Sequence, residues 1–204
     1  MIYALIPAKS ESRRIKRKNF IRISGKTLLE FTLDLALESE IFDRIIVSSE
    51  KRFAFLKYPS ILFDQRPKKL AKDDTKTDEL ILYLIKKYRM KKDDIIFLLQ
   101  PTSPLRNIDD LKRSFELFLK KRKTVISVEE IENKGHIYIS KNNRIEPLPY
   151  GKFFKQNGSI YIFSVRDFLK NKSIPENFQP YLMDRVKSID IDEYLDYIIT
   201  LNLI

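Results

Sequence analysis

The chain has 204 residues, 43% of them hydrophobic and 33% charged, which is typical of a single folded domain rather than a disordered chain. It has no cysteine, one histidine and four glycines, which excludes disulfides, cysteine metal sites, sites with two histidines, the dinucleotide fingerprint and the Walker A loop. Lys and Arg outnumber Asp and Glu by 39 to 28, which gives a net charge of +11. The excess cations are either solvent-exposed surface residues without a partner, or they attract anions such as nucleotides, nucleic acids and lipid headgroups.

Short apolar runs rich in β-branched residues alternate with longer amphipathic stretches. The expected strands cover residues 2–6, 44–47, 95–99, 124–128 and 159–163. The expected helices cover residues 26–38, 74–88 and 108–121, and Asn107 or Asp109 can cap the last of them. Strand followed by helix, repeated, predicts an α/β fold whose mostly parallel sheet is covered on both faces. Ligands of such a sheet bind beyond the carboxyl ends of its strands.

The alternation of strand and helix stops after Val128. Residues 135–149 are polar, with alternating Ile137 and Ile139 and an Asn142-Asn143 turn, which predicts a small hairpin outside the main sheet. Residues 186–204 predict one more strand that runs into a terminal helix. We therefore expect one domain over residues 1–204, with an excursion at about 129–156.

The sequence gives no sign of a membrane protein. No apolar run approaches the roughly 18 residues of a membrane span, and no charged leader precedes the first strand. We expect a cytoplasmic protein without a membrane partner.

The segment after the first strand is strongly basic. Six of the ten residues from Lys9 to Lys18 are Lys or Arg, and Ser10 and Ser12 are small enough to let backbone amides approach a ligand. At this edge of the sheet, a fixed group of cations can offset the charge of a triphosphate. A basic surface loop without a ligand, or one that contacts nucleic acid, would have the same composition.

Four further stretches carry polar residues in distinctive patterns. They are FDQRP at residues 63–67 with the following residues to Thr77, LLQPTSPLR at 98–106, NGSIYI at 157–162 and SIDID at 188–192. Asp190 and Asp192 alternate along an extended segment, so both carboxylates can face one cation, and Mg²⁺ prefers such oxygen ligands. Asp190 and Asp192 are also compatible with a solvated strand end or a helix cap, and Gln100 and Asn157 with ordinary turn residues.

Together, the five stretches resemble the signatures of the acylneuraminate cytidylyltransferases, or CMP-sialic acid synthetases. The basic loop is similar to IPARxGSKxxxxKN, and the other stretches to RPxxLAxD, LLQPTSPLR, NGAIYI and SVDID, in the same order. The resemblance covers residues 2 to about 196. It implies a Rossmann-like three-layer α/β/α nucleotidyltransferase fold and a homodimer.

The resemblance also implies a reaction in which CTP and a 2-keto sugar acid of the sialic, legionaminic or pseudaminic class give a CMP-sugar and pyrophosphate. Its motifs assign catalysis to Lys9, Lys18 and Asp192, nucleotide binding to Lys9, Ser12, Lys18, Asn19, Arg66 and Thr77, sugar binding to Gln100, Arg106 and Asn157, and Mg²⁺ to Asp190 and Asp192. The alternatives are a relative that uses another acid, such as 3-deoxy-manno-octulosonate, and a basic nucleotide-binding or RNA-binding protein without catalysis, although nucleic acid is the less expected partner.

Three positions depart from the family pattern. Lys9 replaces an arginine and lacks its planar fork. Glu11 replaces a glycine, so its carboxylate either points away from the site or weakens CTP binding. The Arg-Gln pair that helps bind the sugar carboxylate is absent. Candidates to replace it are Arg144, Lys152 and Lys155. We assign no role to the lone histidine, His136.

Overall fold

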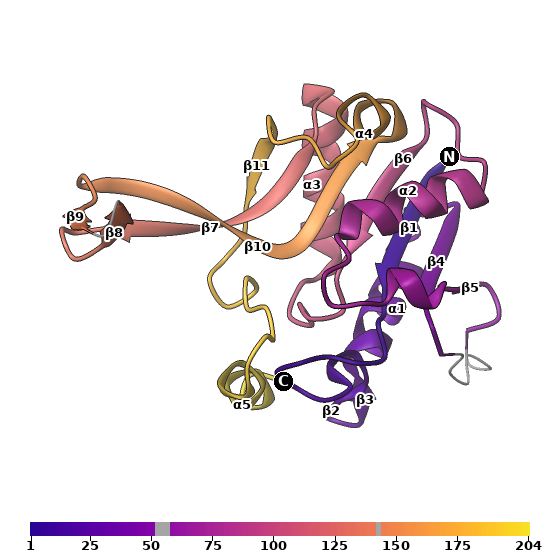
Figure 1. Ribbon diagram of the computed structural model, residues 1–204, viewed down its shortest axis with the longest axis horizontal. Coiled ribbons are helices and arrows are strands. Elements are labelled where there is room, and N and C mark those ends of the chain that lie inside the picture. Colours follow the sequence, from indigo (N-terminus) through magenta and orange to yellow (C-terminus); the bar gives the residue numbers. More distant parts are fainter. Residues whose placement is uncertain (52–57, 142–143) are drawn as a thin grey trace.

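The computed structural model describes residues 1–51, 58–141 and 144–204. Its centre is a seven-stranded sheet in the order β11-β7-β10-β6-β1-β4-β5 (Figure 1). The strands are β1 (Ile2–Pro7), β4 (Arg44–Ser49), β5 (Leu62–Gln65), β6 (Ile95–Leu99), β7 (Val125–Asn133), β10 (Gly151–Ser164) and β11 (Gln179–Leu182). β10 is antiparallel to both of its neighbours and the other pairs are parallel. The mostly parallel sheet is confirmed.

Helices cover both faces of the sheet and form a three-layer α/β/α sandwich. The helices are α1 (Leu28–Glu38), α2 (Thr77–Lys87), α3 (Ile108–Lys121), α4 (Val165–Asn171) and α5 (Tyr194–Leu201). Leu33 of α1 and Phe118 of α3 pack in one core cluster on the sheet, whereas Leu84 of α2 and Phe168 of α4 pack in the cluster on the opposite face. Burying each such side chain contributes roughly 1.5–3 kcal/mol. The same layering leaves the carboxyl ends of β1, β4 and β6 at one edge.

Local sequence sets the helix boundaries. Asn107 caps α3, and its side chain and that of Asp110 each accept a hydrogen bond from the other's backbone N–H. Thr27 and Glu30 form the same reciprocal cap on α1. Residues 26–27, expected in that helix, instead form the short strand β3 (Lys26–Thr27), which pairs with β2 (Arg22–Ile23).

The strand expected at the start of residues 186–204 is wrong. The chain turns there, because the Ser188 N–H donates to the Asp184 carbonyl and the Ile189 N–H to the Val186 carbonyl. The last strand of the sheet is instead β11, whose Pro180 lacks the N–H of a typical strand residue and is tolerated at this edge position. The expected terminal helix is confirmed as α5.

A ribbon of antiparallel strands projects from the sandwich (Figure 1). β7 and β10 stay paired from Val128 and Gln156 out to Asn133 and Gly151, and their register shifts between Gln156 and Tyr161, where the ribbon joins the sheet. At the tip lies the expected hairpin of β8 (Tyr138–Lys141) and β9 (Arg144–Pro147). Its expected turn at 142–143 lies outside the described residues. We call residues 129–156 the arm.

Among the described helices, none combines the length and apolar composition that crossing a bilayer requires.

Candidate active site

A cavity of about 290 Å³ lies at the carboxyl ends of β1 and β6. The chain passes from β1 to β4 on one side and to β6 on the other, and ligands bind at such a reversal of strand order. We call it the nucleotide cavity because the resemblance assigns nucleotide binding to several of its residues. It brings together most of the sequence-predicted site residues from five separate segments. Those in its wall are Lys9, Ser12, Lys18, Asn19, Arg66, Thr77, Gln100 and Asp192.

The cations of the basic loop are paired with carboxylates from distant segments. Lys18 Nζ lies 2.5 Å from Asp192 Oδ1, and Arg14 Nη1 lies 2.8 Å from Asp192 Oδ2. Lys9 and Arg13 both pair with Asp73. Burial opposes the ionisation of Asp192, but its bonds to Lys18 and Arg14 outweigh burial and lower its pKa. An anion that enters the cavity would therefore meet Lys9, Arg13 and Lys18 already ordered by carboxylates.

A hydrogen-bonded acid that the sequence reasoning missed holds the loop in place. Glu50 accepts hydrogen bonds from the backbone N–H of Ser10, at 2.8 Å, and from its hydroxyl. Asn19 secures the far end by donating from Nδ2 to the Lys9 carbonyl at 2.9 Å. The sequence could have indicated Glu50, because it directly follows β4, and β4 ends at the same edge of the sheet as β1 and β6.

Arg66 is 5% exposed and forms part of the cavity wall. Its Nη2 donates to the Ser48 carbonyl at 2.7 Å, and its Nε donates to the Ser48 hydroxyl at 3.3 Å. The Ser48 hydroxyl in turn donates to the fully buried Asp64, which also accepts from Lys87. Burial lowers the pKa of Arg66, although the charge of Glu50 opposes the change. This network fixes where the guanidinium points.

The amino terminus of α2 faces the nucleotide cavity. Thr77 is its first residue and lines the cavity with Thr75 and Lys76. The first N–H groups of a helix and its dipole favour an anion at this end.

Arg106 occupies a different place from the one its motif implied. It is 4% exposed and does not line the nucleotide cavity. Its Nη1 donates to the Ser159 carbonyl, and its Nη2 donates to Thr32 Oγ1 at 2.8 Å and to the Gln100 carbonyl at 3.1 Å. Burial lowers its pKa to about 10. Arg106 therefore positions the backbone of Gln100.

A second cavity of about 750 Å³ adjoins the first, between the root of the arm and α5. Asn157 and Asp190 line it. The Asn157 amide is engaged within the protein, accepting from Ser127 Oγ at 2.6 Å and donating to Ser188 Oγ at 2.9 Å. Gly158 has φ +73, and a Cβ there would lie 3.2 Å from Asp190 Oδ2, so this position requires glycine.

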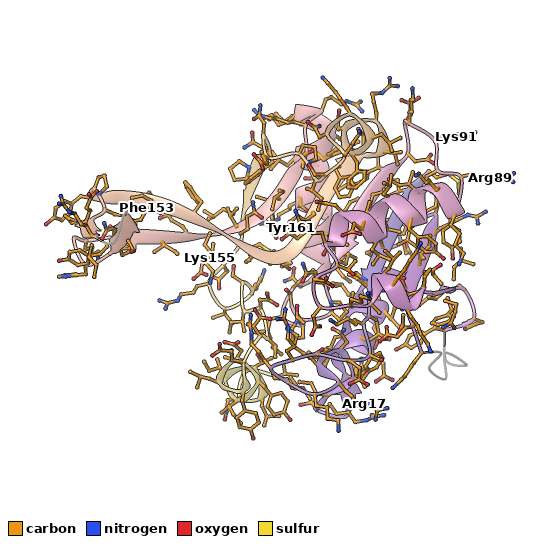
Figure 2. All side chains as sticks on the ribbon, in the orientation of Figure 1. Arg17, Arg89, Lys91, Phe153, Lys155 and Tyr161 are labelled. Carbon is orange, nitrogen blue, oxygen red and sulfur yellow. The ribbon has the colours of Figure 1, made fainter. Side chains whose placement is uncertain are left out.

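A third cavity of about 280 Å³ is lined by Gln100, Gln156 and Tyr161. Gln100 also lines the nucleotide cavity and Gln156 also lines the second cavity, so the three cavities adjoin. Figure 2 shows Tyr161 inside the sandwich and Lys155 at the root of the arm. Sequence reasoning placed Tyr161 in a strand but missed it as a cavity residue.

Asp190 and Asp192 fit a magnesium site. Asp190 Oδ1 is buried and has no hydrogen-bond partner among the described residues. Burial raises the pKa of Asp190 and outweighs the neighbouring Thr102 hydroxyl, which lowers it, and the nearby charge of Asp192 raises it further. Both line the second cavity, although no group of three His, Asp or Glu side chains able to hold a metal occurs in the described part of the chain. Mg²⁺ commonly takes only one or two carboxylates and completes its shell with substrate phosphates and water.

Glu11 points away from the nucleotide cavity, which is the first of the two alternatives that its replacement of a glycine left open. Its Oε1 lies 3.2 Å from Lys51 Nζ, and it is absent from the cavity wall. It is not among the six described non-glycine residues with positive φ, so its backbone does not demand glycine.

Comparison with known proteins identifies relatives of the whole chain. The family described as Cytidylyltransferase matches residues 3–198. The chain is 31% identical over 218 residues to the CMP-N,N'-diacetyllegionaminic acid synthase of Legionella pneumophila, covering 98% of this chain and 94% of the relative. It is 30% identical over 212 residues to the N-acylneuraminate cytidylyltransferase of Escherichia coli O18:K1:H7, covering 96% of this chain but only half of that relative.

Solved structures support the fold. A 4-diphosphocytidyl-2C-methyl-D-erythritol synthase superposes with a TM-score of 0.75 at 15% identity, covering 99% of this chain and 98% of that one.

Proposed function

The chain belongs to the cytidylyltransferase family, and we propose that it transfers CMP from CTP to a 2-keto sugar acid with release of pyrophosphate. The anomeric hydroxyl of the acid attacks the α-phosphorus of CTP and loses its proton. A new oxygen–phosphorus bond forms, and the bond from the α-phosphorus to the β-phosphate oxygen breaks. The acid is of the sialic, legionaminic or pseudaminic class, which the named relatives support.

One contact carries the proposal most directly. Lys18 and Asp192 are 174 positions apart in the sequence and meet at 2.5 Å in the nucleotide cavity. Lys18, beside a basic loop, can bind the leaving phosphates and offset the charge that develops as they depart. Asp192 holds the lysine in the position this requires. Lys9 and the amino terminus of α2 bind the remaining phosphate oxygens, with Ser12 in the same wall.

The nucleoside and the sugar acid bind to different residues around that contact. Arg66 and Asn19 bind the nucleoside from the cavity wall. Gln100, held by Arg106, binds the sugar acid where the nucleotide cavity meets the third cavity. Asn157 shapes this region through Ser127 and Ser188.

Asp190 and Asp192 would hold Mg²⁺, which when bound offsets phosphate charge and favours deprotonation of the attacking hydroxyl. The buried, unpartnered Asp190 Oδ1 supports this assignment. Each oxygen of Asp192 is paired with a cation, Oδ1 with Lys18 and Oδ2 with Arg14, so a bound Mg²⁺ would compete with these pairs.

We further propose a homodimer joined through the arm and active in the cytoplasm. Tyr138, Ile145, Tyr150 and Phe154 are all more than half exposed on the arm, and such a set of apolar side chains is typical of a surface that a second subunit covers. The absence of cysteine is compatible with a reducing compartment.

The test is pyrophosphate release from CTP and Mg²⁺, with N-acetylneuraminate, N,N'-diacetyllegionaminate, pseudaminate and 3-deoxy-manno-octulosonate offered separately. UTP and ATP are the controls. We expect release with CTP and one of the first three acids. Release with the octulosonate alone would move the substrate to a different class. A protein that binds neither CTP nor any acid, and binds RNA with a steep salt dependence, would refute the proposal.

A further inference from the structure

Arg14 lies at the junction of two cavities. Among the residues that the structure describes, Arg14 and Asp192 are the two that line both the nucleotide cavity and the second cavity. They are paired at 2.8 Å. The position is left open in the loop signature IPARxGSKxxxxKN, so the resemblance assigns Arg14 no role.

The chemistry of the proposed substrate requires a cation at such a junction. In a 2-keto sugar acid, the carboxylate and the attacking hydroxyl are bonded to the same carbon. When the hydroxyl reaches the α-phosphorus in the nucleotide cavity, the carboxylate must therefore lie at the border of that cavity. A carboxylate close to a triphosphate needs a positive partner to offset the repulsion.

The other candidates for this task are less well placed. Lys155 and Arg185 line the second cavity but not the nucleotide cavity. Lys152 pairs with Glu130 at 2.9 Å on the arm, and Arg144 lies in β9 at the arm's tip. None of these four meets both cavities.

Arg14 already binds a carboxylate in the required place. The Arg14 side chain is 60% exposed, and its partner Asp192 is also paired with Lys18. Breaking the contact between Arg14 and Asp192 therefore leaves neither charge buried and unpaired. Exposed ion pairs contribute little to stability, so exchanging one carboxylate for another is easy. The planar guanidinium can hold both oxygens of a carboxylate at once, which a lysine cannot do.

We propose that Arg14 binds the carboxylate of the sugar acid, giving up Asp192 when the substrate enters. The inference rests on the proposed function and names the residue that replaces the absent Arg-Gln pair. The exchange also frees Asp192 Oδ2 only after the acid has bound.

The experiment compares Arg14→Ala, Arg14→Lys and the neighbouring Arg13→Ala in the intact protein. Two quantities are measured: the Kd of CTP by calorimetry without a sugar acid, and the KM of the acid that the wild type uses best, at saturating CTP. We expect Arg14→Ala to raise this KM about 10-fold or more, the effect of losing a charge-assisted hydrogen bond, and to leave the CTP Kd within about twofold. Arg14→Lys restores part of the loss. Arg13→Ala has the opposite pattern, because Arg13 lines only the nucleotide cavity.

A further readout uses the amide of the same acid as a competitive inhibitor. The wild type should bind the acid more tightly than the amide, and Arg14→Ala should lose this preference. An unchanged KM, or a CTP Kd weakened as much as in Arg13→Ala, would overturn the role of Arg14 while the cytidylyltransferase activity stands. A wild type that releases no pyrophosphate with any acid of the panel would refute the proposed function, and the Arg14 inference with it.

Discussion

The nucleotide cavity and the arm are built in opposite ways. Around the cavity, Asp64 and Arg66 are almost fully buried and hydrogen-bonded to residues from other strands. On the arm, Ile145 is 77% exposed and Tyr150 is 81% exposed. This wall of the cavity is therefore fixed by contacts within one chain, whereas the arm leaves apolar surface uncovered. We therefore expect ligand chemistry in the sandwich and the proposed association in the arm, and four variants test this division.

Lys18→Ala should have the largest effect. Removing a cation that contacts the departing phosphates should lower kcat about 10²- to 10³-fold, as loss of one transition-state contact does. Lys16→Ala is the matched control, because Lys16 is on the same loop but outside the cavity wall. Steady-state pyrophosphate release measures both. Equal losses in the two variants would show that the loop acts only through its overall charge.

Asp64→Ala should damage the sandwich. It removes the buried acceptor of the Ser48 hydroxyl and of Lys87, so the free energy of unfolding should fall by about 1–3 kcal/mol. The KM of CTP should rise as well, because Ser48 positions Arg66. Urea unfolding provides the measurement. The control is Asp93→Ala, which breaks an exposed pair with Arg166 and should cost less than about 1 kcal/mol.

Ile145→Asp tests the arm. It should leave the free energy of unfolding of the monomer nearly unchanged and raise the dimer Kd about 10-fold or more, as the loss of a central apolar contact does. Analytical ultracentrifugation measures the Kd. Leu119→Asp, on an exposed position of α3, should leave the Kd unchanged. A dimer insensitive to the Ile145 variant would locate the interface elsewhere.

Asp190→Asn should change the free energy of unfolding by a small amount that depends on pH, whatever it does to activity. Because burial raises the pKa of Asp190, its ionisation destabilises the fold as the pH rises through that value. Asparagine cannot ionise, so the variant should be more stable than the wild type at pH 7.5 by on the order of 1 kcal/mol, with no gain below about pH 4. Urea unfolding at both pH values measures the difference. A gain of equal size at both would mean that charge is not the cause.

The sequence predicted the elements that local pattern determines. The strand at 95–99 and the helix at 108–121 have their expected bounds, because a buried β-branched run and a capping box are local signals. β11 was missed because Pro180 disfavours a strand except at an edge, and only the folded sheet supplies that edge.

The candidate site shows the same limit. The sequence brought Lys18, Arg66 and Asp192 to one place through their motifs, and the structure groups them there. The sequence could not show that Arg106 lies outside this cavity, although its motif is equally clear. The place of Arg106 depends on hydrogen bonds to Ser159 and Thr32, which come from distant elements. Nothing in the sequence separated Arg14 from the other basic residues of its loop. Its proposed role rests on its position at the junction of two cavities, which only the structure shows.

The strand β10 connects the arm to the cavities. β10 is one unbroken strand that begins on the arm and ends deep in the sandwich, and Gly158 lies in its irregular stretch against Asp190. The exposed arm is therefore joined by one continuous stretch of backbone to Gln156 and Tyr161, which line the cavities.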